Sequence, residues 1–348
     1  MRFVDRLWNG EGQADQIART ALLPLEALYR GAVAVRSELY DRHVLPIVTS
    51  TVPVLSIGNL TVGGTGKTPI ASWFAGRIAR DGGKPAIVLR GYGGDEVLVH
   101  RALTPDIEVI VDKDRASGIR RAADAGATAV VLDDAFQHRR ASRQADVVVV
   151  SADAWTGRTR MLPAGPWREP LESIRRASIA LISRKSASTE KLDEVARAIA
   201  EVAPQLAQAS VRLRMSEVAL VGSPATRQDV STIAGKRILA VSAIGDPGAF
   251  NGQLVQLGAT VASVVFADHH AYSTTDVDRI LTQSRGQDLI VCTLKDGVKL
   301  GPLWPASAPP LWYVSQSLDV ERGLAEIDDI LSPFLVPRQS QPSHSGRF

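Results

Sequence analysis

The chain has 348 residues, of which 45% are hydrophobic and 22% are charged, and this composition excludes a wholly disordered chain and a collagen-like fibre. Lys and Arg (40) outnumber Asp and Glu (37) by only three, so we expect no nucleic-acid partner. The single cysteine, Cys292, excludes an intramolecular disulfide and a cysteine-based zinc site. At roughly 150 residues per domain, the length suggests about two domains.

Residues 20–40 interleave leucine, valine and tyrosine with Glu and Arg, which predicts an amphipathic helix. Such a helix either packs on the core or lies in a membrane interface, and the pattern by itself favours the first. Residues 43–66 carry no Asp, Glu, Lys or Arg and are long enough to cross a bilayer. Because prolines and glycines interrupt them, we interpret them as a loop, a buried strand and a glycine-rich turn.

Apolar, β-branched runs then alternate with helical patterns along the chain. Strands are expected at residues 52–57, 86–89, 107–111, 128–132, 146–150, 179–183, 238–242, 261–266, 289–293 and 312–314. Helices are expected at residues 67–80, 117–125, 190–202, 247–257 and 275–283. Nearly continuous apolar strands are typical of a parallel sheet covered on both faces, so the pattern predicts an α/β fold.

Pro204 and the Gly222-Ser223-Pro224 run predict loops and a domain boundary near residues 203–232. We therefore expect an N-terminal amphipathic segment (1–45), a mostly parallel first domain (46–205) and a smaller α/β domain (206–336). A polar, Pro- and Ser-rich tail (337–348) is expected to be disordered. Residues 139–185 contain ten Lys and Arg against four Asp and Glu, a basic stretch that suggests an anionic ligand or surface.

The expected strand at 52–57 runs into Gly-Gly-Thr-Gly-Lys-Thr at residues 63–68, followed by the expected helix, which is the context of a phosphate-binding P-loop. Glycines let backbone N–H groups surround phosphates, Lys67 can reach the β- and γ-phosphates, and the Thr68 hydroxyl can bind Mg²⁺. The common pattern has Gly where this chain has Thr61. The residues predicted to bind ATP are Thr61, Val62, Gly63, Gly64, Thr65, Gly66, Lys67 and Thr68.

The apolar strand at 128–132 is followed by Asp133 and Asp134, where a P-loop fold places its acidic metal partner. With Thr68, these two aspartates are the predicted Mg²⁺ ligands. Paired aspartates at the end of a strand can also simply cap the next helix.

Two further clusters contain candidates for a general base, the group that accepts the acceptor hydroxyl's proton. Asp95 and Glu96 follow a glycine-rich turn after the strand at 86–89, and Asp268, His269 and His270 follow the strand at 261–266. Both clusters lie at carboxyl ends of expected strands, where α/β sites form. From the residues alone, each cluster is as compatible with a loop cap as with catalysis, and the second could also bind a metal.

Several motifs in order resemble the tetraacyldisaccharide 4′-kinase family. The P-loop from Gly58 to Pro69 looks like that of the family, and so do the N-terminal Leu-rich helix and five further segments. These segments are Arg-Gly-Tyr-Gly (90–93), Asp-Asp-Ala-Phe-Gln-His (133–138), Leu-Pro-Ala-Gly-Pro-Trp-Arg-Glu (162–169), Ile-Gly-Asp-Pro (244–247) and Phe-Ala-Asp-His-His-Ala-Tyr (266–272). The resemblance covers about residues 1–335.

This resemblance implies a P-loop kinase fold with the site in a cleft between two α/β domains. It also implies the reaction: ATP, with Mg²⁺, phosphorylates the 4′-hydroxyl of a tetraacyl glucosamine disaccharide 1-phosphate in lipid A biosynthesis. The implied location is peripheral, on the cytoplasmic face of the bacterial inner membrane. The amphipathic helix then becomes a docking element for an anionic membrane surface, and the basic stretch a partner for phosphates.

The resemblance also implies roles for individual residues. Asp95 matches the catalytic acidic residue and His269 the histidine that supports it. Arg115, His138, Arg168 and Glu169 match positions linked to substrate or nucleotide handling. The chain departs from the family pattern at Ala135, where Gly is usual, at Leu294, where Glu is usual, and in a shortened segment before Asp95.

Two other classes of protein remain as alternatives. One is a P-loop ATPase switch of the membrane-partitioning or metallochaperone type, which has no small-molecule acceptor. Such proteins usually carry a Lys just before the double glycine, where this chain has Val62. The other is a non-enzymatic membrane-associated binding protein that uses the P-loop only for stability.

Overall fold

The computed structural model describes residues 7–8, 10, 12–91 and 94–335 of the chain. The tail expected to be disordered, residues 337–348, lies outside the described residues, as do Tyr92 and Gly93 of the Arg-Gly-Tyr-Gly motif. In the described part of the chain, no helix is both long enough and apolar enough to cross a membrane.

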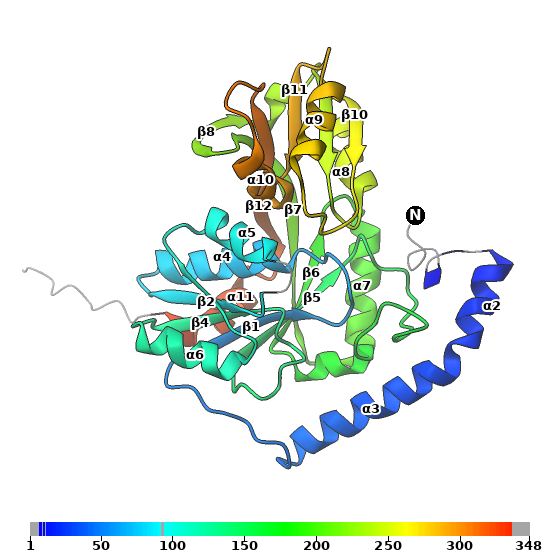
Figure 1. Ribbon diagram of the computed structural model, residues 1–348. Helices are drawn as coiled ribbons and strands as arrows, with labels where there is room; N and C mark the ends of the chain where they lie inside the picture. The colour runs from blue at the N-terminus through cyan, green and yellow to red at the C-terminus, as the bar shows by residue number, and fades with distance from the viewer. Residues whose placement is uncertain (1–6, 9, 11, 92–93, 336–348) are drawn as a thin grey trace, which may run out of the picture.

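The described chain folds into two lobes that share one sheet (Figure 1). The strands of this sheet are β1 (Val54–Asn59), β2 (Pro85–Leu89), β3 (Glu108–Val111), β4 (Ala129–Asp133), β5 (Ala145–Ser151), β6 (Ile179–Arg184), β7 (Ala207–Leu220), β8 (Ser223–Asp229), β9 (Arg237–Ser242), β10 (Thr260–Val265), β11 (Leu289–Thr293) and β12 (Leu311–Arg322). Their order is β10-β9-β11-β12-β7-β6-β5-β1-β4-β2-β3, with β8 paired to β7. Ladders are parallel except where β7 pairs with β8 and β12.

Helices cover the sheet and connect its parallel strands. They are α2 (Gln13–Ala21), α3 (Leu23–Asp41), α4 (Lys67–Arg80), α5 (Asp95–Leu103), α6 (Arg115–Asp124), α7 (Thr189–Val202), α8 (Pro247–Gln256), α9 (Thr274–Gln283), α10 (Leu294–Leu300) and α11 (Leu324–Leu331). Short 3₁₀ turns occur at Leu171–Arg176, Val230–Ile233, Gly301–Leu303 and Ser332–Phe334. The expected α/β class is confirmed, and every strand and helix expected between residues 52 and 314 has a counterpart.

The lower lobe is built around β1, whose six residues are all buried because β4 and β5 flank it and helices cover both faces of the sheet. On one face, α4 packs with Ile70, Phe74 and Ile78 fully buried. On the other, α7 and the segment around Trp167 form a second cluster. Burial on both faces explains why these strands have no alternating polar pattern.

Turns lie at Pro204 and at Gly222, where loops were predicted, but the strands that fill most of residues 203–232 were not predicted. Strand β7 runs through residues 207–220 and β8 follows it. Residues 207–212 of β7 pair with β6 in the lower lobe, residues 217–220 pair with β8, and β12 pairs with β7 along residues 210–220. Strand β7 is only partly buried along much of its length and contains Arg212, Arg214 and Glu217, and β8 is mostly exposed, so both lack the apolar run by which the other strands were recognised.

The upper lobe contains β8–β12 with α8, α9 and α10, and β7 and β12 connect it to the lower lobe (Figure 1). After β12 the chain returns, and Ile327, Leu331 and Phe334 pack in the lower core. The division at residues 205 and 206 stays a prediction.

The helix predicted for residues 20–40 is α3, which begins at Leu23; a second helix that was not predicted, α2, precedes it, and the chain turns at Leu22 between the two. Both run along the outside of the lower lobe (Figure 1). Tyr29 and Val33 of α3 pack against the cluster that contains Trp167, while Leu25, Leu28 and Val35 are exposed. Helix α3 therefore has one face toward the protein and an apolar stripe toward solvent.

Candidate active site

The P-loop lies between β1 and α4, at the carboxyl end of a central strand. Gly63 and Gly66 have φ of 109° and 83°, values that favour glycine. Thr65 is fixed by side chains of β1 and β6: Asn59 Nδ2 donates to its hydroxyl at 3.0 Å, and Ser183 Oγ donates to its carbonyl at 3.0 Å. Backbone amides at the start of α4 and the helix dipole make this loop a ready anion site.

Thr61 occupies the position where the common pattern has glycine, and the structure accounts for this. Its backbone forms an isolated antiparallel bridge with Trp167, and the next amide, that of Val62, donates to the Pro166 carbonyl at 2.8 Å. Extended backbone of this kind needs no glycine. The segment 166–168 thus supports the P-loop from outside.

The two aspartates after β4 have different partners. Asp133 Oδ2 accepts a hydrogen bond from Thr68 Oγ1 at 3.3 Å. Asp134 has a φ of 50°, which turns its carboxylate toward Lys67 (Nζ–Oδ1 3.7 Å) and Arg168 (Nη2–Oδ1 2.8 Å and Nη1–Oδ2 3.1 Å). Both predicted aspartates therefore lie beside the P-loop: Asp133 contacts its threonine, and Asp134 contacts its lysine.

Positively and negatively charged side chains are concentrated around the P-loop and the two aspartates. Burial would raise the pKa of Asp134, but Lys67 and the hydrogen-bonded Arg168 lower it to about 2. Glu96, at the start of α5, faces the same aspartates, and its pKa is raised by burial and by the charges of Asp133 and Asp134. A third carboxylate, which the sequence offered only as a candidate base, therefore lies near the predicted metal position.

Thr68 and Asp133 fit a Mg²⁺ ion. Among the described residues, Asp133 Oδ1 is a buried oxygen without a hydrogen-bond partner, whereas Oδ2 is occupied. The described residues include no group of three or more His, Cys, Asp or Glu side chains that could hold a metal by themselves. A nucleotide-bound Mg²⁺ requires only one or two protein oxygens, because phosphates and water complete its shell.

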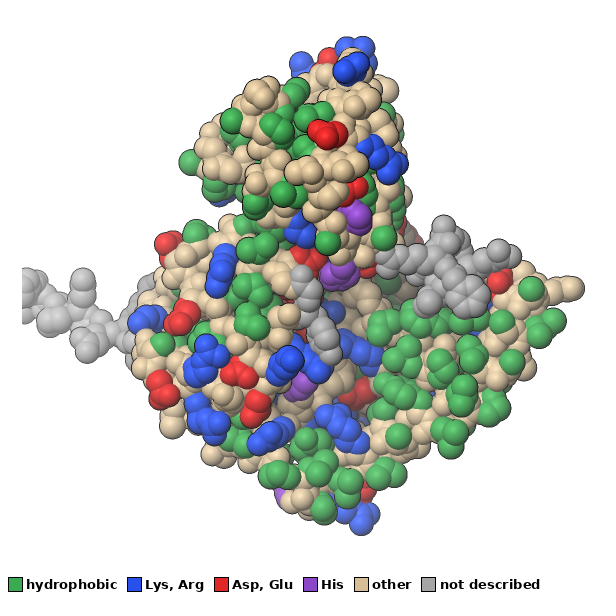
Figure 2. All heavy atoms as spheres, viewed as in Figure 1, with side chains coloured by type: hydrophobic (Ala, Val, Ile, Leu, Met, Phe, Trp, Pro, Cys, Tyr) green, Lys and Arg blue, Asp and Glu red, His purple; other side chains and the backbone are tan. Residues whose placement is uncertain are grey.

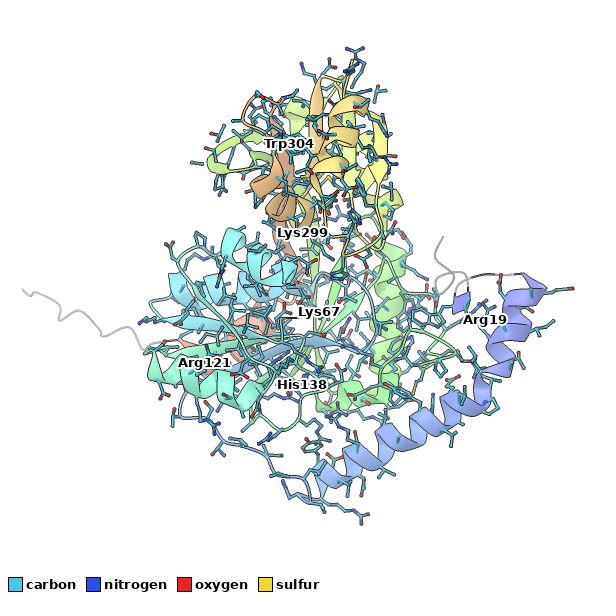
Figure 3. All side chains as sticks on the ribbon, viewed as in Figure 1. Arg19, Lys67, Arg121, His138, Lys299 and Trp304 are labelled. Carbon is cyan, nitrogen blue, oxygen red and sulfur yellow. The ribbon has the colours of Figure 1, made fainter. Side chains whose placement is uncertain are left out.

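Asp95 is the point where the two lobes meet. It is 2% exposed at the first turn of α5 in the lower lobe, and its side-chain partners come from the upper lobe. His269 Nδ1 lies 3.0 Å from Asp95 Oδ2, with Lys295 Nζ at 3.5 Å and Lys299 Nζ at 4.0 Å. In Figure 3, Lys299 lies at the junction of the lobes, with Lys67 below it in the lower lobe.

The hydrogen bonds of His269 define which ring nitrogen carries the proton. Lys295 Nζ, which can only donate, lies 3.2 Å from Nε2, so Nε2 is the acceptor. The proton is then on Nδ1 and is donated to Asp95. His269 has a φ of 60°, and its amide donates to the Ala243 carbonyl at 3.3 Å, which fixes the turn that presents the ring.

Arg115 and His138 line a separate cavity of about 420 Å³ between α3, the start of α6 and the loop after Phe136. Arg36, Lys113 and Arg140 also border it, so the cavity is strongly basic. Arg115 is 4% exposed and donates to the Asp112 carbonyl at 2.9 Å. Burial and the charges of Arg115 and Arg90 lower the pKa of His138 from 6.5 to about 4.

Arg168 and Glu169 are adjacent in sequence but have different surroundings. Arg168 joins Asp134 to Asn59, whose side-chain oxygen accepts from it, so it borders the P-loop. Glu169 is buried and accepts from Arg176 Nη2 at 2.7 Å, so it acts on this arginine and not on the phosphate side. The Tyr29 hydroxyl of α3 donates to the Arg168 carbonyl at 3.0 Å.

Sequence reasoning missed His100, Lys295 and Lys299, and it named Glu96 only as a candidate base. Glu96 and His100 lie on α5, which was not predicted because a glycine-rich turn precedes it. Lys295 is part of the Thr-Leu-Lys-Asp segment at 293–296, whose likeness to the family pattern was a signal for it. Lys299 lies one turn after Lys295 on α10, so its place beside Lys295 becomes apparent only once this segment is known to be a helix.

The basic cavity yields a pH prediction. Because the pKa of His138 is below 6.5 in the folded chain, His138 is neutral at pH 6, and its contribution to stability falls as the pH drops from 6.5 through 4. Arg115→Met removes a neighbouring positive charge and should raise this pKa. Titration of histidine-labelled protein by NMR checks both values, and a wild-type pKa near 6.5 would contradict the cavity's electrostatics.

Comparisons with known proteins agree with this arrangement. The family model described as "Tetraacyldisaccharide-1-P 4'-kinase" matches residues 18–96 and 93–332. The chain is 36% identical to a tetraacyldisaccharide 4′-kinase of Anaeromyxobacter dehalogenans strain 2CP-1, covering 88% of each chain, and 35% identical to that of Halorhodospira halophila, covering 88% of this chain and 90% of the other.

A solved structure agrees as well. The crystal structure of LpxK from Aquifex aeolicus in complex with ATP is 26% identical and superimposes with a TM-score of 0.73, over 91% of this chain and 99% of the other. With a P-loop, paired aspartates and an Asp–His pair in the positions that the motifs indicate, the chain belongs to the tetraacyldisaccharide 4′-kinase family.

Proposed function

We propose that this chain phosphorylates the 4′-hydroxyl of a tetraacyl disaccharide 1-phosphate with ATP, using Asp95 as the base and a Mg²⁺ ion at Thr68 and Asp133. The activity is that of its family. The observation that carries the assignment of the base is the burial of Asp95 where the two lobes meet, with His269 and two lysines of the upper lobe around it. The proposed base therefore lies in the same lobe as the P-loop, at the boundary with the upper lobe.

In the proposed reaction, the acceptor oxygen attacks the γ-phosphorus of ATP as the bond to the β–γ bridging oxygen breaks and ADP departs. Asp95 takes the proton of the acceptor hydroxyl. His269 donates from Nδ1 to one carboxylate oxygen and accepts from Lys295 at Nε2, which keeps that oxygen oriented. Positioning of the acceptor against the phosphate supplies much of the rate.

Charge on the triphosphate is met by Lys67 and by the P-loop amides. Lys67 lies 3.7 Å from Asp134, so incoming phosphates compete with this carboxylate for the lysine. Arg168 remains bonded to Asp134 and keeps that carboxylate paired. Mg²⁺ bound at Thr68 and Asp133 supplies further neutralisation of the charge on the transferring phosphoryl group.

The basic cavity at Arg115 and His138 suits the anionic end of the acceptor. A phosphate there would meet Arg36, Lys113, Arg115 and Arg140, and His138 is neutral and can donate or accept. Burial and, after it, the charges of Arg115 and Arg90 lower the pKa of His138, and a phosphate would offset the arginine charges. We therefore propose that Arg115 and His138 hold the substrate's phosphate-bearing sugar, and that Arg168 acts on the nucleotide side.

Helices α2 and α3 provide the membrane-facing surface in this proposal. Leu25, Leu28 and Val35 of α3 are more than half exposed and share one stripe, and Ile17 of α2 is 70% exposed. Figure 2 shows hydrophobic side chains gathered over these helices on the face that also carries the Lys and Arg side chains. Arg36 and Tyr40 of the same helix border the basic cavity, so a lipid entering from the bilayer would meet it directly.

The ATPase-switch alternative is not favoured, because the comparisons name lipid kinases along nearly the whole chain. A peripheral position on the cytoplasmic face of the inner membrane follows from the proposal, since ATP is cytoplasmic and the acyl chains of the acceptor stay in the bilayer.

The base assignment predicts that Asp95→Asn lowers the transfer rate by about 10²- to 10⁴-fold, because the amide cannot accept the hydroxyl proton. Binding of a fluorescent ATP analogue should stay within a few-fold of wild type, since Asp95 does not line the P-loop. His269→Gln should lose less activity than Asp95→Asn. Near-normal transfer by Asp95→Asn, with nucleotide bound, would reject Asp95 as the base.

The docking surface predicts that Leu25→Glu with Leu28→Glu lowers partition onto anionic phospholipid vesicles by at least about tenfold, because two exposed leucines no longer enter the interface. The matched control is Val255→Glu with Leu324→Glu, which alters two apolar residues of similar exposure outside α2 and α3. Vesicle co-sedimentation measures both. Equal partition by the two double variants would contradict docking through α3.

A further inference from the structure

His100 is a fully buried histidine that contacts Asp133, the aspartate proposed to bind Mg²⁺. It lies near the end of α5, and its Nε2 is 2.9 Å from Asp133 Oδ2. Its Nδ1 is 2.8 Å from Ser72 Oγ on α4. One imidazole therefore joins α5, α4 and the end of β4.

The carboxylate fixes the direction of one of these bonds. A carboxylate oxygen only accepts, so Nε2 carries a proton and donates to Asp133, whereas the Ser72 hydroxyl can donate to Nδ1 or accept from it. Asp133 Oδ2 thus receives two donors, Thr68 and His100, while Oδ1 stays buried without a partner. Two donors on one oxygen hold the carboxylate in a single rotation and leave the other oxygen for a cation or its bound water.

The same contact links the metal side to the base. Helix α5 begins with Asp95 and carries His100 five residues later, so the bond to Asp133 fixes the helix that presents the base against the strand that presents the metal ligand. Ser72 is one turn after Thr68 on α4, so the P-loop helix is included in this chain of bonds.

We propose that His100 is a positioning residue that orients Asp133 for Mg²⁺, an inference that rests on the metal site proposed above. The partners that orient a metal ligand typically change metal affinity by 10- to 100-fold when they are removed. A buried histidine could also serve only to stabilise the fold, and the test therefore measures metal affinity directly.

The test uses Mn²⁺ as the probe and the full chain with a non-hydrolysable ATP analogue, with free Mn²⁺ measured by electron paramagnetic resonance. His100→Asn retains a group near Ser72 but does not reach Asp133, and it should weaken Mn²⁺ binding by about 10- to 100-fold. His100→Gln places an N–H donor near the position of Nε2 and should return to within about threefold of wild type. The Mg²⁺ concentration for half-maximal transfer should shift in parallel.

Two controls separate positioning from general damage. Asp133→Asn removes the carboxylate, and adding His100→Asn to it should cause no more than about a twofold further loss if His100 acts through Asp133. His270→Asn removes another histidine–aspartate pair, Nε2 to Asp276 Oδ2 at 3.1 Å in the upper lobe, and should leave Mn²⁺ binding unchanged.

The outcomes distinguish the two levels of the proposal. If the wild-type chain with nucleotide binds no Mn²⁺, the metal site itself is wrong. If wild type binds Mn²⁺ and His100→Asn binds it equally well, the role of His100 is rejected. If thermal melting shows that His100→Asn does not fold, Ser72→Ala takes its place: a loss of Mn²⁺ affinity of threefold or more supports the proposal, and a wild-type value rejects it.

Discussion

A buried carboxylate must be surrounded by donors or cations, and Asp95 meets this requirement only when the two lobes are together. Its backbone belongs to the lower lobe, whereas His269, Lys295 and Lys299 belong to the upper lobe. Separating the lobes would expose the carboxylate and take away its side-chain partners, at a cost that the ion pairs and the imidazole now offset. The base already lies in the P-loop lobe, and the same closure brings His269 and the two lysines to it. Contact between the lobes therefore both stabilises the buried carboxylate and places the residues that orient it.

The sheet makes this possible. Strands β7 and β12 pair with each other along residues 210–220 and 312–322, and β7 continues into the lower lobe beside β6. A two-stranded antiparallel connection can flex more than a parallel sheet packed on both faces, and its side chains are largely paired to each other, as Arg214 is to Asp319 (2.9 Å). The P-loop and the two aspartates lie on the rigid part, where all of β1 is buried.

The sequence was informative for strands that are fully buried and for the P-loop, whose backbone conformation requires glycine. Apolar runs predicted the central strands, and the P-loop motif predicted Lys67 and Thr68 beside Asp133 and Asp134. It was uninformative where the structure uses polar strands or contacts between distant segments. Charged β7 had no apolar run, and Glu96, His100 and Lys299 gain their roles only because α5, β4 and α10 meet. Asp95 and His269 are 174 residues apart, so only the family resemblance paired them in advance.

The central claim is that this junction transfers phosphate to a lipid acceptor and not to water. The most direct measurement follows the γ-phosphate of labelled ATP in detergent with Mg²⁺, with and without purified tetraacyl disaccharide 1-phosphate. We expect label to enter the lipid, and turnover of ATP to depend on the lipid. Release of labelled phosphate at the same rate in the absence of the lipid would contradict the claim.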